Sequence, residues 1–222
     1  MPTQYATVVS GNNNLIRAST YADINNGNLN TESGSAYVTI DNGNSNVAGG
    51  TPDPFSPPIS YLTINNGNNN SVITGDYNTI NNGDNNSINI NFSTITTTNH
   101  SIINNGSNNN ISSGEYSTVG NGNTNQITQD CHYDTILNGT SNKIQLTSNG
   151  LILNGDHNNI NKADGRITKY DSINNGDHNR LDGCIYSTVA NGSTNHMIDN
   201  NYGNIINGYN NEVGCFTTET AY

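Results

Sequence analysis

The chain has 222 residues, of which 31% are hydrophobic and 10% are charged, and its formal net charge is −11. Six basic against seventeen acidic residues exclude the basic surface that nucleic-acid binding requires. No apolar run is long enough to span a membrane, and no signal peptide is visible in this numbering.

A unit with a period of 16 recurs along the sequence, marked by the glycine of an Asn-Gly pair, or of Ser-Gly in the first unit. The steps between successive markers are 16, 16, 24, 16, 23, 16, 17, 16, 21, 16 and 16, so twelve units carry four insertions. The markers are Gly11, Gly27, Gly43, Gly67, Gly83, Gly106, Gly122, Gly139, Gly155, Gly176, Gly192 and Gly208.

Each unit is expected to hold two short strands joined by a turn. Three positions before the marker stands a β-branched aliphatic residue, from Val8 to Ile205. Five positions after it stands an apolar residue, from Ile16 to Val213, and only Glu32 breaks this column. Such side chains suit a half-buried pleated surface. The Asn-Gly pair tolerates positive φ and predicts a tight turn.

The first three units are uninterrupted, and insertions follow near 51–58, 91–97 and 163–167, with one extra residue near Asp130. The first insertion holds four of the five prolines. All four insertions fall at one phase of the unit, so they should emerge from one edge, either as a binding face or as a tolerant corner. Because the repeat runs throughout, residues 1–222 are predicted to form a single repeat domain.

Apolar columns in phase at a period of 16 predict an all-β fold, a single β-solenoid (β-helix) of about twelve coils. Like residues then stack on like, about 4.8 Å apart. Three positions after each marker is an asparagine, and this column is expected to form a ladder of amides bonded to one another and to turn backbone. Its members are Asn14, Asn30, Asn46, Asn70, Asn86, Asn109, Asn125, Asn142, Asn158, Asn179, Asn195 and Asn211.

Six positions before the marker lies a tyrosine column, interrupted by His100 and Asn149. Its rings are expected to stack as an aromatic ladder, which either covers a corner or forms an adhesive stripe. The tyrosines are Tyr5, Tyr21, Tyr37, Tyr61, Tyr77, Tyr116, Tyr133, Tyr170, Tyr186 and Tyr202.

Four positions before the marker, seven units carry threonine: Thr7, Thr39, Thr63, Thr79, Thr118, Thr135 and Thr188. The segment 117–128 resembles in phase the central repeat of bacterial ice-nucleation proteins, Ser-Thr-Gln-Thr-Ala-Gly-X-X-Ser-X-Leu-Thr, which has the same period. That resemblance implies an outward threonine face that binds ice. The Gly-X-X-Asn-X-aliphatic portion also resembles the curlin repeat of bacterial amyloid fibres, which implies stacked amides and end-to-end polymerisation.

Gly155-Asp156-His157-Asn158 and Gly176-Asp177-His178-Asn179 are identical turns on consecutive units. They offer nitrogen and oxygen donors, but not at the spacing of a closed zinc site, so solvated turns are the simpler interpretation. No metal, cofactor or catalytic constellation is predicted, and the protein is expected not to be an enzyme. Cys131, Cys184 and Cys215 give no disulfide framework.

Neither end of the repeat shows an evident capping element, so both ends are expected to be open edges. The predicted function is a structural, extracellular or cell-surface subunit that polymerises with itself, head to tail. The alternatives are an ice-binding or ice-nucleating solenoid that uses the threonine column, and an adhesin or carbohydrate binder that uses the tyrosines and the insertion edge.

Overall fold

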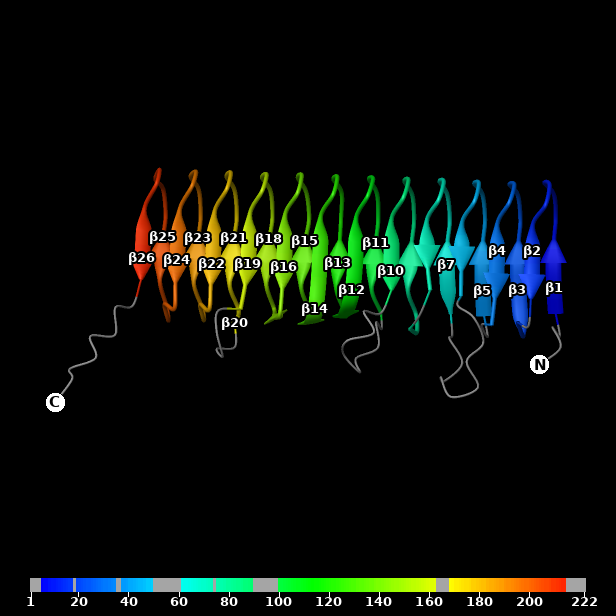
Figure 1. The fold of residues 1–222 in the computed structure, drawn as a ribbon, viewed down its shortest axis with the longest axis horizontal. Coiled ribbons are helices and arrows are strands. Elements are labelled where there is room, and N and C mark those ends of the chain that lie inside the picture. Colours follow the sequence, from blue (N-terminus) through cyan, green and yellow to red (C-terminus); the bar gives the residue numbers. More distant parts are fainter. Residues whose placement is uncertain are drawn as a thin grey trace.

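The computed structural model describes residues 5–17, 19–34, 37–49, 61–73, 75–89, 100–162 and 168–214. These residues form an all-β solenoid of stacked coils (Figure 1), which confirms the predicted fold class. The predicted insertions at 51–58, 91–97 and 163–167, and Cys215, lie outside the described residues.

Each coil contributes one strand to each of two parallel sheets, and the coils follow one another along the stack (Figure 1). The first sheet contains β1 Tyr5–Val8, β3 Tyr21–Ile24, β5 Tyr37–Ile40, β7 Leu62–Ile64, β9 Thr79–Ile80, β11 Ile102–Ile103, β13 Thr118–Val119, β15 Thr135–Ile136, β18 Leu151–Ile152, β21 Ser172–Ile173, β23 Thr188–Val189 and β25 Asn204–Ile205. The second contains β2 Leu15–Arg17, β4 Thr31–Ser33, β6 Val47–Ala48, β8 Ser71–Val72, β10 Ser87–Asn89, β12 Asn110–Glu115, β14 Gln126–His132, β16 Lys143–Gln145, β19 Asn159–Asn161, β22 Arg180–Asp182, β24 His196–Ile198 and β26 Glu212–Gly214, with β17 Thr147–Ser148 and β20 Thr168–Lys169 beside them.

The register between coils is unaffected by the three longer insertions. Ile40 pairs with Ile64 across the first insertion in the same way as Ile64 pairs with Ile80, where the chain has no insertion. The single extra residue near Asp130 produces an irregularity in the pairing of β12 with β14, where Ser112 faces Thr128 but Gly114 faces Cys131. We number the coils one to twelve by their marker glycines.

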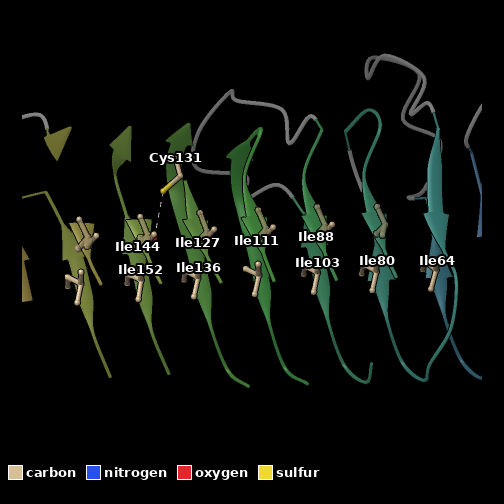
Figure 2. Close-up of a cluster of buried hydrophobic side chains, with 14 of the residues drawn as sticks. Ile64, Ile80, Ile88, Ile103, Ile111, Ile127, Cys131, Ile136, Ile144 and Ile152 are labelled. Carbon is tan, nitrogen blue, oxygen red and sulfur yellow. Dashed lines mark hydrogen bonds between the residues drawn. The ribbon is translucent and has the colours of Figure 1, made fainter. Parts of the chain in front are cut away.

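The core is a pair of aliphatic columns, one from each sheet, that run along the stack (Figure 2). Residues such as Ile80 and Ile103 in the first sheet, and Ile88 and Ile111 in the second, are 0% exposed. Glu32, which breaks the second column in the sequence, is also fully buried. Burial of a β-branched or other apolar side chain from each strand is the main force holding one coil on the next.

A third buried column, five positions before the marker, was not predicted. It is apolar in coils two to four, with Ala22, Val38 and Leu62, and then mostly polar. The polar members are each 0% exposed: Asn78, Ser101, Ser117, Asp134, Asp171 and Ser187. Several of these side chains bond to the next coil, as when the Ser101 N–H donates to Asn78 Oδ1 at 2.9 Å. A polar column of this kind is compatible with burial because its bonds run along the stack.

The turn differs in detail from the sequence expectation. The marker glycines do have positive φ, from 112° to 158°, but the asparagines before them do not. Instead the residue two positions after each marker is left-handed, as at Thr124 with φ 58°. The glycine is required by close packing as well: a Cβ on Gly83 would lie 1.9 Å from the carbonyl oxygen of Gly106.

Replacing Thr124 with asparagine is expected to stabilise the solenoid by about 0.5–1 kcal/mol, because a β-branched residue is strained in the left-handed region and asparagine is not. Thr124 is exposed, and Asn69, Asn85 and Asn108 occupy the same position in other coils. Denaturant unfolding measures the change. Thr118→Asn, in the strand β13, is the control, and an equal gain there would contradict the explanation.

Candidate self-association and binding surfaces

The predicted asparagine column forms the inner ladder of the stack. Asn125 Nδ2 donates to the carbonyl oxygen of Gly139 at 2.9 Å, and Asn125 Oδ1 accepts from the N–H and Nδ2 of Asn142 at 3.0 and 3.1 Å. The ten members from Asn30 to Asn195 are 0% exposed. The amide ladder is therefore confirmed, and its groups are accessible only where the ladder ends.

A second, exposed ladder is formed by the asparagines immediately before the markers, which we call the outer ladder. Nδ2 of Asn66, Asn82 and Asn105 donates to Oδ1 of the next member at 3.0, 3.1 and 2.9 Å. Sequence reasoning assigned these residues to the turn and missed their mutual bonding. Their regular recurrence in eleven units was the available signal.

A shallow polar groove of about 540 Å³ runs beside the outer ladder over coils three to seven. It is lined by residues one and two positions before the markers, and we call it the amide groove. Asn65 Nδ2 donates to Asn81 Oδ1, and Asn81 Nδ2 to Asn104 Oδ1, each at 2.8 Å. Each of these amides has a second N–H and a second lone pair, so the groove presents a row of neutral donors and acceptors at the coil spacing, with the carboxylate of Asp41 at one end.

The tyrosine column forms two stacks of rings. The first runs from Tyr5 to Tyr133 and includes His100, with centroids 4.6–5.0 Å apart and planes within 14°. Asn149 interrupts it, and Tyr170, Tyr186 and Tyr202 form the second. The rings are 41–73% exposed, so the predicted aromatic ladder lies on the surface.

The threonine column lies on the outward face of the first sheet, beside the tyrosines. Thr39, Thr63 and Thr79 are successive partners, and Thr118 pairs with Thr135. Asp23, Ile102, Leu151, Ser172 and Asn204 occupy the column in the other coils. The structure therefore brings the threonines together in short rows and leaves Thr7 and Thr188 apart from them.

The two end coils expose groups that every internal coil covers. Val8 is 48% exposed, whereas its equivalents from Ile24 to Val189 are 0% exposed. At the other end, Asn211 Nδ2 donates to Asn195 Oδ1 at 3.1 Å, but no described residue supplies the glycine carbonyl that its equivalents bind. Tyr5 and Tyr202 are 63% and 73% exposed, more than any ring between them. Within the described part of the chain, both ends of the ladders are open.

Three carboxyl groups lie fully buried in the stack: Glu32, Asp134 and Asp171. Burial raises the pKa of Glu32 and of Asp171 to about 7, and that of Asp134 to about 6. In each, one oxygen accepts hydrogen bonds and the other has none. Asp171 Oδ1, for example, accepts from the Ser187 N–H at 2.8 Å. All three residues are 0% exposed, so we assign them a structural role within the stack.

The remaining predicted positions divide into buried and exposed groups. Cys131 and Cys184 are buried free thiols, and burial raises the pKa of Cys184 to about 11. The imidazoles of His157 and His178 are exposed and stack on each other with centroids 4.7 Å apart.

No protein-family model and no curated protein matches this sequence. Among the described residues, no helix is long and apolar enough to cross a membrane. The fold and its surfaces define the chain as a parallel β-solenoid with a coil period of 16, an asparagine ladder and an exposed tyrosine ladder.

Proposed function

We propose that this protein is a structural subunit that self-associates head to tail, coil twelve of one molecule stacking on coil one of the next. The observation that supports the proposal is the complementarity of the end coils. Each end coil exposes positions that are buried in the internal coils. The coil at the opposite end of a second molecule carries, at the same repeat positions, the residue types that cover those positions inside the stack.

The contacts of such a junction follow from those inside the stack. Asn14 Oδ1 accepts the N–H of Asn30, and Asn14 Nδ2 donates to the Gly27 carbonyl. By the same geometry, Asn211 Oδ1 would accept from Asn14 of the next subunit and its Nδ2 would donate to Gly11. Ile205 would cover Val8, and Tyr202 would stack on Tyr5.

This contact joins two different surfaces of the molecule and is close to a pure translation along the stack. A heterologous contact that does not close on itself produces an open filament. The net charge of −11 opposes association of identical subunits, so added salt should favour it. The resemblance to the curlin repeat is consistent with a fibre subunit, and the expected location is extracellular or the cell surface.

Negative-stain electron microscopy across a concentration series tests the proposal. We expect unbranched filaments of uniform width that lengthen with concentration, and isolated rods about 58 Å long at the lowest concentration. Val8→Lys should abolish the filaments, since it places a charge in the junction. Leu137→Lys is the matched control, because Leu137 is 39% exposed and lies in an internal coil, away from both ends of the stack. Short rods at every concentration, or filaments of Val8→Lys, would refute head-to-tail assembly.

Ice binding is the second candidate function. It is favoured by the threonine rows on the outward face of the first sheet, which repeat at the coil spacing. The resemblance to the ice-nucleation repeat points the same way. Thermal hysteresis, or a raised freezing temperature, that is lost in Thr79→Leu and Thr118→Leu would support it.

Adhesion to a glycan is the third candidate. The amide groove supports it, because a row of neutral donors and acceptors matches the hydroxyl groups of an uncharged polysaccharide. Retention on immobilised polysaccharides that falls when Asn81 and Asn82 are replaced with alanine would favour this function over the other two.

A further inference from the structure

The turns of coils nine and ten carry the one histidine pair that stacks in the described part of the chain. His157 and His178 each lie two positions after a marker glycine, with φ of 55° and 54°. Because the two backbones are alike, the rings project in the same direction, and their planes differ by 3°. Neither imidazole takes part in the asparagine ladders or in the tyrosine ladder.

Asp177 brings a carboxylate to the same place. Its Oδ1 lies 2.7 Å from Nδ1 of His178, and ligand atoms of His157, Asp177 and His178 all lie within 4.8 Å of one another. Two ligand atoms bound at right angles to one transition-metal ion are roughly 3 Å apart. Asp177 and His178 therefore already have a chelating separation, and His157 needs only a tilt of its exposed ring out of the stack.

The local charge also favours a cation. Asp156 and Asp177 are direct neighbours in adjacent coils, so two carboxylates stack in one column. The other carboxylate of that column, Asp84, stands between the neutral Asn68 and Ser107. Nearby Arg180 is engaged by Asp182 through its Nε atom. Repulsion between stacked carboxylates is unfavourable, and a divalent cation beside them would offset it.

We propose that His157, Asp177 and His178 form a binding site for a divalent transition-metal ion such as Ni²⁺, Cu²⁺ or Zn²⁺, with water as the remaining ligands. Imidazole nitrogen selects these ions, whereas Ca²⁺ and Mg²⁺ prefer sites made wholly of oxygen. The side chains of Asp177 and His178 are 51% and 58% exposed, so the ion would enter from solvent without any opening of the fold. This site is independent of the proposed self-association, because it lies on the side of the stack and not at its ends.

Isothermal titration of the full chain with Ni²⁺ at neutral pH tests the site. We expect one ion per chain, and His157→Asn, His178→Asn and Asp177→Asn should each weaken binding at least tenfold. Asparagine is native at the equivalent left-handed position in Asn85 and Asn108, so both histidine variants should fold. Circular dichroism confirms folding, and Ca²⁺ should give no comparable binding.

The matched control is His100→Asn, because His100 stacks in the tyrosine column and Asn149 occupies an equivalent position there. This variant should bind Ni²⁺ as the parent protein does. Absence of Ni²⁺ binding, or an affinity in His157→Asn or His178→Asn equal to that of the parent, would overturn the proposal.

Discussion

Replacing Asn125 with leucine is expected to destabilise the solenoid by about 3–6 kcal/mol, since two or three buried polar groups lose their partner at about 1–3 kcal/mol each. The Gly139 carbonyl loses the hydrogen bond from Asn125 Nδ2, and the Asn142 N–H loses the oxygen that accepts it. Leucine is similar in size to asparagine, so the change tests the amide and not the volume. Equilibrium unfolding in urea measures the effect.

Asn121→Leu is the matched control for the inner ladder. Asn121 belongs to the same coil and also bonds along the stack, with Nδ2 donating to Asn138 Oδ1 at 3.2 Å, but it is exposed. Water can replace its hydrogen bonds, so the cost should stay below about 1 kcal/mol. Equal costs at Asn121 and Asn125 would mean that burial of the ladder is not what makes it stabilising.

The stability of the solenoid is expected to fall as the pH rises from about 4 to about 7. The pKa of Asp171 is raised by burial to about 7, from 3.8, so the folded chain holds a proton that the unfolded chain has released in this range. Glu32 and Asp134 shift in the same direction, to about 7 and about 6. The folded state binds more protons and is therefore favoured at low pH. The contribution of these three carboxyl groups to the free energy of unfolding is fully present below about pH 4 and is lost above about pH 7.

The variant that isolates this effect is Asp171→Asn, measured by urea unfolding at pH 4, 6 and 8. At pH 8 we expect stabilisation by about 2–4 kcal/mol, since no buried charge has to be accommodated. Asn78 shows that an asparagine fits this column, because its Oδ1 accepts from the next coil as Asp171 Oδ1 does. Asp84→Asn removes the same charge from an exposed turn and controls for net charge. A variant with the parent's pH dependence would contradict the assignment.

The fold could be predicted from the sequence because its two aliphatic columns and its asparagine column recur in every coil or nearly so. The positions of Ile80, Ile88 and Asn86 in the core follow directly from their phase in the repeat. Stacking of the tyrosines follows from the same periodicity. Identical spacing forces like residues into contact, whatever the residue is.

Other features could not be predicted, because they do not recur with the period of the repeat. The column that contains Leu62, Asn78 and Asp171 changes from apolar to polar along the chain, so its burial has no sequence pattern. The turn was misjudged because Asn-Gly usually supplies positive φ at both residues, whereas here the asparagine bonds along the outer ladder. The histidine pair at His157 and His178 was visible, but the contact with Asp177 depends on side-chain geometry.

The strands of neighbouring coils pair in the same register whether or not one of the longer insertions lies between them. This has a consequence for how such a chain can vary in length. Ile80 pairs with Ile103 across one insertion, and Ile152 pairs with Ile173 across a shorter one. A coil is thus a removable unit whose neighbours on either side already match. Gain or loss of one whole repeat would change the reach of the rod by about 4.8 Å and leave its cross-section as it was. Length and surface pattern are in this way separate properties, and duplication of a repeat can alter one without altering the other.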